Sequence, residues 1–238
     1  MSFSDGENLV HMPAVQDHKR AYENDTGPNT GGMGTYSDSD HSLPFLEKNH
    51  IESAQKINEK TAKALKHKFG EGYKGILYGG FIATNAGVEL IEYNARFGDP
   101  EAMNVLSILD SDLIEICEAI ISENLNNTKI VFKNLATVCK YAVPEGYPDD
   151  PIKGHQIDVS EVKNKNILFY ASVENKDDNL IQIGSRAIAV VGHGETIWEA
   201  EQIAEKNILK VKGPLFHRKD IGTTDLIQKK LNHMSSLK

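Results

Sequence analysis

The residues best suited to chemistry lie in one short segment near the middle of the chain, where Glu92, Asn94 and Arg96 alternate with apolar or small side chains. Side chains of a β-strand alternate between two faces, so Glu92 and Asn94 would point the same way at the end of a strand. A carboxylate and an amide oxygen side by side suit Mg²⁺, which takes oxygen ligands and often leaves its other positions to water and phosphates. The spacing favours a metal–nucleotide site, although a solvated strand edge would give the same pattern.

Arg96 would fall on the same face as this pair if the strand continues that far. A guanidinium in that position can bind a phosphate or a carboxylate through two parallel hydrogen bonds. We therefore expect Arg96 to hold an anion next to the two metal ligands.

A second candidate is the glycine-rich segment Asp25–Gly34, which reads Asp-Thr-Gly-Pro-Asn-Thr-Gly-Gly-Met-Gly. Its glycines leave backbone N–H groups free to converge on an anion, as phosphate-binding loops do. Just upstream, His18, Lys19 and Arg20 bring cations close to the same segment, and such cations can steady phosphoryl oxygens. Plain turns and a solvated run of charges are the competing interpretations.

The residue patterns predict the elements that must hold these groups. In order, they are a hairpin over residues 3–12, a long loop over 17–42, a helix over 46–69 and a hairpin over 75–94. Asp99 is then expected to cap a short helix whose first residue is Pro100. Asp110 or Ser111 should open another helix, with Cys117 on its apolar side.

The character of the chain changes near residue 134. Strands are expected over 136–143, 167–173 and 180–191, separated by turns rich in proline, glycine and aspartate. A helix should follow from Ile197, because Thr196 and Glu199 have the spacing of a capping box. We therefore predict two domains, over residues 1–133 and 134–238.

Composition excludes several classes of function. The chain has 238 residues and a formal net charge of −8, and its lysines are scattered rather than gathered into a basic block. This argues against nucleic acid as a partner. The sequence contains no apolar run of the roughly 18 to 20 residues that a membrane span needs, and no signal-peptide pattern. A cytoplasmic protein without membrane partners is expected.

Taken in order and approximate spacing, the segments 16–20, 25–34 and 96–101 resemble the motifs of glycinamide ribonucleotide synthetase (phosphoribosylamine–glycine ligase), a family of the ATP-grasp superfamily. Arg218-Lys219-Asp220-Ile221-Gly222 is similar to that family's C-terminal signature. The resemblance implies the C-terminal half of such an enzyme. The implied fold is α+β, an incomplete ATP-grasp type with a mixed or antiparallel sheet, flanking helices and a β-rich C-terminal domain.

The resemblance also implies a reaction and its ligands. ATP would phosphorylate glycine, and 5-phosphoribosylamine would attack the glycyl phosphate to give glycinamide ribonucleotide, ADP and phosphate. Glu92 and Asn94 would hold Mg²⁺ or Mn²⁺, and the expected catalytic residues are Arg96, Asp25, Lys19 and Arg20. The residues implied at the substrates are Asp25, Asn29, Thr30, Gly31, Gly32, Arg96, Asp99 and Pro100.

The chain also departs from the family pattern. A Rossmann-like domain and a nucleotide lid should precede Phe3, and residues 79–82 offer no acidic metal ligand on the strand before Glu92. Little activity is therefore expected without a separate N-terminal half, and an apolar patch should be exposed where that half would dock. The alternatives are a non-catalytic fragment, a subunit of a split ligase, or another ATP-grasp carboxylate–amine ligase.

Overall fold

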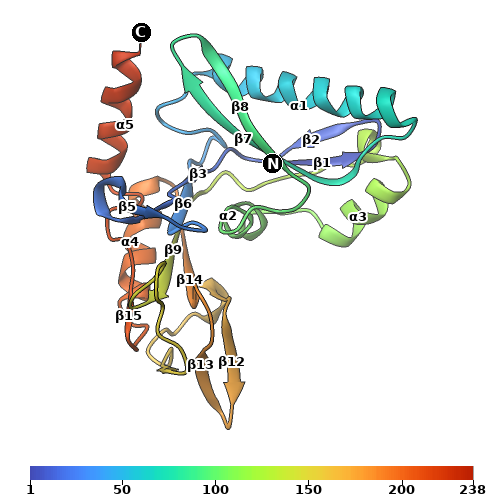
Figure 1. Cartoon of the computed structure of the whole chain (residues 1–238). Helices are drawn as coiled ribbons and strands as arrows, with labels where there is room; N and C mark the ends of the chain where they lie inside the picture. Colours follow the sequence, from blue (N-terminus) through green and yellow to red (C-terminus); the bar gives the residue numbers. More distant parts are fainter. Residues whose placement is uncertain (238) are drawn as a thin grey trace.

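The Glu92 segment lies at the edge of the first of the main sheets. In the computed structural model, which describes residues 1–237, this antiparallel sheet has the strand order β2-β1-β7-β8. Its strands are β1 (Ser2–Asp5), β2 (Leu9–His11), β7 (Lys74–Thr84) and β8 (Gly87–Asn94). Both predicted hairpins are confirmed. α1 (Lys48–Phe69) covers one face of the sheet and α3 (Leu113–Ile121) lies against the other (Figure 1).

The long helix α1 confirms the prediction over residues 46–69. Glu47 and His50 form a capping box at its start, and Gly70 ends it in the left-handed conformation, φ 79°. Asn58 of α1 is buried on the side of the helix that faces the sheet. Its amide oxygen accepts a hydrogen bond from the Tyr93 hydroxyl of β8 at 3.0 Å. Tyr93, the residue after Glu92, therefore faces α1, and Glu92 itself faces the other way.

The opposite face of the sheet packs on the core that holds α2 (Glu101–Ser107) and α3. Two predicted helix starts are wrong. Asp99 does not cap α2: the cap position is Pro100, whose side chain has no hydrogen-bonding group, and the Asp99 carboxylate accepts from Tyr141 and Arg186 instead. α3 is capped by Asp112 rather than by Asp110 or Ser111. The Asp112 carboxylate accepts hydrogen bonds from the backbone N–H groups of Ile114 and Glu115.

The second main sheet has the strand order β11-β14-β9-β6-β3, and β15 (Leu215–Phe216) also pairs with β9. Its strands are β3 (Gln16–Asp17), β6 (Gly34–Ser37), β9 (Ala136–Pro144), β11 (Leu168–Tyr170) and β14 (Ile188–Gly194). Every residue of β9 is buried. Pairing of β6 with β9 joins residues on both sides of position 133, so the domain boundary there stays a prediction.

The loop predicted over residues 17–42 is wrong in part. It contains β6 and the two-stranded ribbon of β4 (Arg20–Tyr22) and β5 (Thr26–Asn29), joined by the short turn Glu23–Asp25. The partner of β6 lies about a hundred residues further along the chain. Because this pairing is long-range, the local composition of glycine and polar residues did not reveal it.

The remaining elements complete the C-terminal region. β10 (Gln156–Ile157), β13 (Asn179–Gln182) and β12 (Val173–Lys176) form a small sheet. The strand predicted over 180–191 is therefore two strands, β13 and β14, with a connection between them. α4 (Ile197–Ile208) packs on β9 and β14 and begins with the predicted capping box of Thr196 and Glu199. α5 (Thr224–Ser236) ends the described chain beside the β4–β5 ribbon (Figure 1).

Within residues 1–237, none of the helices combines the length and the apolar character that crossing a membrane requires.

Candidate functional site

Glu92, Asn94 and Arg96 form a continuous row of hydrogen-bonded side chains, called here the β8 row. The Asn94 amide donates to Glu92 Oε1 at 3.1 Å, and the Arg96 guanidinium donates to Asn94 Oδ1 at 3.3 Å. Arg96 also donates to the Phe97 carbonyl at 2.8 Å. Glu92 and Arg96 are exposed and Asn94 is half-buried. Strand alternation therefore places Glu92 and Asn94 on one accessible face, as expected. The strand does not continue to Arg96, because β8 ends at Asn94, and Arg96 joins the row through its hydrogen bond to Asn94 instead.

Two residues behind the row escaped the sequence analysis as site residues, Tyr78 and Glu101. Tyr78 lies opposite Asn94 in the β7–β8 register, and its hydroxyl donates to Glu101 Oε1. Glu101 is 3% exposed, and its second oxygen has no hydrogen-bond partner among the described residues. Burial, and then the Glu101 charge, raise the pKa of Tyr78, so this hydroxyl stays a donor at physiological pH. The signal for Glu101 was its place at the end of the 96–101 motif.

Asp17 and Lys19 form an ion pair with Lys19 Nζ 2.5 Å from Asp17 Oδ2. The other Asp17 oxygen accepts the His18 N–H at 2.7 Å. Burial is the largest influence on Asp17 and the Glu101 charge the next, and together they raise its pKa to about 6. Because Glu101 acts on both Tyr78 and Asp17, these groups share one electrostatic environment with the β8 row.

The amides of the glycine-rich turn are not free to bind an anion, contrary to the expectation for Gly31 and Gly32. The Gly31 N–H donates to the Tyr147 hydroxyl at 3.2 Å, and the Gly32 N–H donates to the Thr30 hydroxyl at 3.0 Å. The flanking amides of Thr30 and Met33 donate to backbone carbonyls of 19 and 18. The turn is therefore a packed connector whose donors are already satisfied by the protein.

The turn is packed closely against the loop that precedes α2. Gly32 has φ +122°, and a Cβ atom built there would lie 2.7 Å from Pro100 Cδ and 3.0 Å from Asp17 Oδ1. Only glycine fits such a contact. Gly31, Gly32, Asp99 and Pro100, all predicted at the substrates, are thus brought together. The Asp99 carboxylate accepts hydrogen bonds from the Tyr141 hydroxyl and from Arg186, each at 2.9 Å.

Asp25 and Arg20 belong to a different cluster, on the β4–β5 ribbon. The Asp25 carboxylate forms an ion pair with Arg218 at 2.8 Å, and Arg218 also donates to the Arg20 carbonyl at 3.1 Å. Burial alone would raise the pKa of Asp25, but the Arg218 hydrogen bond and the nearby cations lower it. The Arg20 side chain donates to the Gly27 carbonyl at 2.7 Å, within its own ribbon. No contact found among the described residues joins either side chain to the β8 row.

Asn29 and Thr30 connect these two regions. Asn29 pairs opposite Arg20 at the end of the ribbon, and the Thr30 hydroxyl donates to the Lys19 carbonyl at 2.8 Å. Asn29 is exposed. The chain from Lys19 to Thr30 is therefore closed into a loop at its base, and the Lys19 side chain is held by its ion pair with Asp17.

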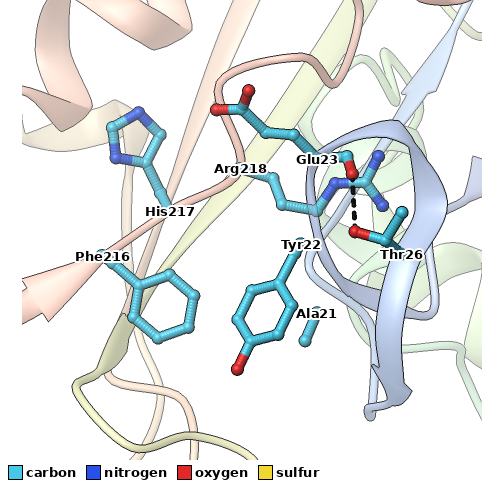
Figure 2. Close-up of a pocket in the computed structure, with 7 residues that line it drawn as sticks. All are labelled: Ala21, Tyr22, Glu23, Thr26, Phe216, His217 and Arg218. Atoms are coloured by element: carbon cyan, nitrogen blue, oxygen red, sulfur yellow. Dashed lines mark hydrogen bonds between the residues drawn. The ribbon is translucent and has the colours of Figure 1, made fainter.

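A hollow of about 360 Å³ opens beside Arg218 (Figure 2). Its walls are Ala21, Tyr22, Glu23, Thr26, Phe216, His217 and Arg218. The rings of Tyr22 and Phe216 lie 6.2 Å apart at its mouth. None of the β8 row lines it, so this hollow lies apart from the residues best suited to catalysis.

The donors of the β8 row suit a divalent cation. Within the described residues there is no group of three or more His, Cys, Asp or Glu side chains that could hold a metal by itself. Glu92 and Asn94 offer two hard oxygen donors once the Asn94 amide turns from its contacts with Glu92 and Arg96, which fits an ion that takes its other ligands from phosphates and water.

Comparison with known proteins places this geometry in a family. Residues 1–102 match the ATP-grasp (A) domain of phosphoribosylglycinamide synthetase, and residues 137–224 match its C domain. Phosphoribosylamine–glycine ligase of Methanosarcina acetivorans is 51% identical over 237 residues, which are 100% of this chain and 54% of the relative. That of Methanocaldococcus jannaschii is 52% identical over 239 residues, 99% of this chain and 54% of the relative. The chain thus spans about half the length of the curated relatives it matches.

Solved structures agree. The crystal structure of phosphoribosylamine–glycine ligase from Thermotoga maritima matches with a TM-score of 0.78 and 31% identity, covering 92% of this chain and 54% of that chain. The urea carboxylase of Kluyveromyces lactis matches with a TM-score of 0.64 and 14% identity, over 96% of this chain and 20% of that chain, which shows a shared fold alone. The predicted α+β, ATP-grasp type fold is confirmed. The chain belongs to the phosphoribosylglycinamide synthetase family, whose members use ATP with a divalent metal ion.

Proposed function

We propose that this chain forms part of an ATP-dependent ligase that joins glycine to 5-phosphoribosylamine through a glycyl phosphate, releasing ADP and phosphate. The single observation that carries the proposal is the β8 row, in which a carboxylate, an amide and a guanidinium are held in line on an exposed face. The relatives at about 51% identity carry the name of that activity.

The reaction needs positioning and neutralisation of charge rather than a covalent nucleophile. In this proposal Glu92 and Asn94 hold Mg²⁺ or Mn²⁺, which when bound neutralises charge on the ATP phosphates. Arg96, exposed at the end of the row, grips a phosphate or the glycine carboxylate with its planar fork. Lys19 reaches the same region from the base of the glycine-rich segment.

Buried groups behind the row keep this arrangement in place. Tyr78 and Glu101 support the strand from below, and Asp17 orients Lys19 through their ion pair. Gly31, Gly32, Asp99 and Pro100 form the wall on the substrate side. Asp25 acts indirectly, since its contact with Arg218 holds the β4–β5 ribbon against the C-terminal segment, and Arg20 braces the ribbon itself through the Gly27 carbonyl.

We infer further that the remainder of the relatives' length, which this chain does not span, completes the nucleotide site. Its docking surface is the outer side of α3, where Leu113 is 38% exposed, Ile114 70% and Ile121 73%. Cys117, expected to be buried, is exposed on the same helix. Such a row of apolar side chains on one helix is typical of a face that a partner covers. The complete enzyme would act in the cytoplasm on small-molecule substrates.

The second candidate is a subunit that binds ligand without turnover of its own. The span of about half the relatives' length favours it, because residues of the nucleotide site then come from outside the described residues. A different ATP-grasp carboxylate–amine ligase is the third, and replacing phosphoribosylamine by other amines in the assay below would reveal it.

The test is an ADP-release assay with glycine, phosphoribosylamine generated in place, ATP and Mg²⁺. It is run on this chain alone and then with the N-terminal half of a close relative added in trans. ADP release only after addition of the second half supports the proposed ligase. Binding of ATP–Mg²⁺ without ADP release in either case would contradict it and favour the ligand-binding subunit.

A further inference from the structure

Arg186 lies in the connection between β13 and β14, and it reaches out of the C-terminal region to the loops at the candidate site. One terminal nitrogen, Nη1, donates to the carbonyls of Gly31, Gly32 and Asp99, each at 3.2 Å. The other, Nη2, forms an ion pair with Asp99 Oδ2 at 2.9 Å. A single side chain thereby ties the glycine-rich turn to the loop before α2.

Two tyrosines of the same region support this contact. The guanidinium carbon of Arg186 lies 4.6 Å above the centre of the Tyr141 ring, within the range of a cation–π contact. The Tyr141 hydroxyl donates to the other oxygen of Asp99 at 2.9 Å. The Tyr147 hydroxyl accepts the Gly31 N–H at 3.2 Å. Both peptide groups of the turn and both oxygens of Asp99 are therefore held from β9, its following turn and the Arg186 connection.

The contact between Arg186 and the glycine-rich turn is close and specific to both residues. The Arg186 side chain is 15% exposed, and a Cβ built on Gly31 would lie 3.1 Å from its guanidinium carbon. The acceptors are spread over two loops, so a planar group with several fixed donors can satisfy them together. A lysine has the charge but presents its donors from one point and cannot span the set.

We propose that Arg186 is a positioning residue that locks the Gly31–Gly32 turn to the Asp99 loop and so sets the geometry of the substrate side of the site. The locking stands on the contacts alone. The consequence for catalysis rests on the proposed ligase function, because it is through the fixed wall of Gly31, Gly32 and Asp99 that Arg186 acts on the substrates.

The first experiment uses this chain alone and needs no turnover. Hydrogen exchange of the Gly31, Gly32 and Met33 amides is compared in the wild type, Arg186→Ala, Arg186→Lys and the control Lys153→Ala, which removes an exposed cation of the same region. Arg186→Ala loses charge-assisted hydrogen bonds, so exchange at these amides should be about tenfold faster than in the wild type, or more. Arg186→Lys should show most of the same acceleration, because lysine cannot replace the planar guanidinium. Ethylguanidinium, added far below denaturing concentrations, should restore slow exchange in the alanine variant.

If Arg186→Ala fails to fold, Asp99→Asn tests the same lock, because it keeps the shape of the side chain and removes the charge that pairs with Arg186. Unchanged exchange at the turn in the folded Arg186→Ala chain, or in Asp99→Asn when the alanine variant does not fold, would overturn the proposal. Faster exchange throughout the molecule that ethylguanidinium does not reverse would also overturn it, since it would indicate a general loss of packing.

The second experiment uses the reconstituted enzyme. Arg186→Ala should raise the KM for glycine or for the amine by about tenfold while the KM for ATP stays unchanged, because the wall that Arg186 holds lies on the substrate side. An equal change in all three KM values overturns the positioning role. If the wild-type halves release no ADP, the proposed ligase function falls, and hydrogen exchange alone decides whether Arg186 is a lock.

Discussion

The β8 row and the cluster of Arg218, Asp25 and Asp220 each combine one arginine with oxygen-bearing side chains, yet they differ in what surrounds them. In the β8 row Arg96 is exposed and its contacts are with near neighbours in sequence. Arg218 is 1% exposed, and its nitrogens donate to Asp25 at 2.8 Å and to Asp220 at 2.9 and 2.7 Å. Its charge is already matched within the protein.

Exposure and the number of bonds already made within the protein separate candidate binding residues from structural ones in the same family motifs. A charged group that is exposed and held from one side still has donors or acceptors for a ligand. A charged group that is buried and fully bonded stabilises the fold, and removing one partner leaves an uncompensated charge. By this criterion Glu92 and Arg96 remain open to a ligand, whereas Arg218 is engaged within the fold and holds Asp25, whose side chain is 39% exposed.

The largest effect on turnover is expected at Glu92, in the exposed β8 row. Replacing Glu92 by Gln keeps the shape and removes the charge, so turnover of the reconstituted enzyme should fall by about a hundredfold or more, with weaker binding of metal–nucleotide. The thermal midpoint of the chain should not change, because the side chain is exposed. Steady-state ADP release and a melting curve check the two statements together. Retained turnover would remove Glu92 from the metal site.

The largest effect on stability is expected at Arg218. Arg218→Ala leaves Asp220 without its cation, leaves Asp25 with Lys230 alone at 3.8 Å, and opens space in the interior, which should cost about 3 kcal/mol of unfolding free energy. For a domain of this size the thermal midpoint should fall by roughly 6 to 12 °C. Urea unfolding measures it, with Lys153→Ala as the control. A variant as stable as the wild type would show that the buried cluster is not structural.

A smaller kinetic effect should follow from Arg96→Lys. The point charge of lysine cannot replace the two parallel hydrogen bonds of the planar guanidinium, so kcat/KM should fall by about ten- to a hundredfold. Stability should stay within about 0.5 kcal/mol, since the site is on the surface. Kinetics near those of the wild type would mean that Arg96 does not touch the reacting groups.

The smallest effect is a dependence of stability on acid pH. Burial alone would raise the pKa of Glu205, but hydrogen bonds from His217 and Lys140 outweigh it and lower the pKa from 4.5 to about 2. A carboxyl group with a lowered pKa stabilises the fold above its unfolded value, and this stability is lost as pH falls from about 4.5 towards 2. Glu205→Gln should flatten part of that decline in denaturation curves, and an unchanged slope would contradict the assignment.

The parts of the molecule predicted from sequence are those fixed by short-range patterns. Strand alternation placed Glu92 and Asn94 on one face, and helical spacing predicted α1. The capping box of Thr196 and Glu199 predicted the start of α4. In each case the residues that decide the outcome lie within a few positions of one another, so the pattern is visible in the chain itself.

What escaped prediction depends on partners far away in sequence. The acceptors of Arg186 lie up to 155 positions upstream, and its segment looked like the middle of a strand. The amides of Gly31 and Gly32 looked available because Tyr147, which accepts the hydrogen bond of the Gly31 amide, lies 116 positions away from it. Aspartate is a common helix-capping residue, but the carboxylate oxygens of Asp99 accept hydrogen bonds from Tyr141 and Arg186 instead. Tertiary contacts override local preference in all three cases.

The insertion of β6 between β3 and β9 limits how the molecule can be divided. Residues 34–37 pair with 137–140 of β9. A polypeptide starting after residue 133 would therefore leave that side of β9 as an open edge, with backbone donors and acceptors exposed on a strand that is otherwise buried. Open apolar edges recruit other chains and aggregate. Anyone wishing to produce the C-terminal region by itself should supply the segment 16–37 with it, as a fused strand or as an added peptide.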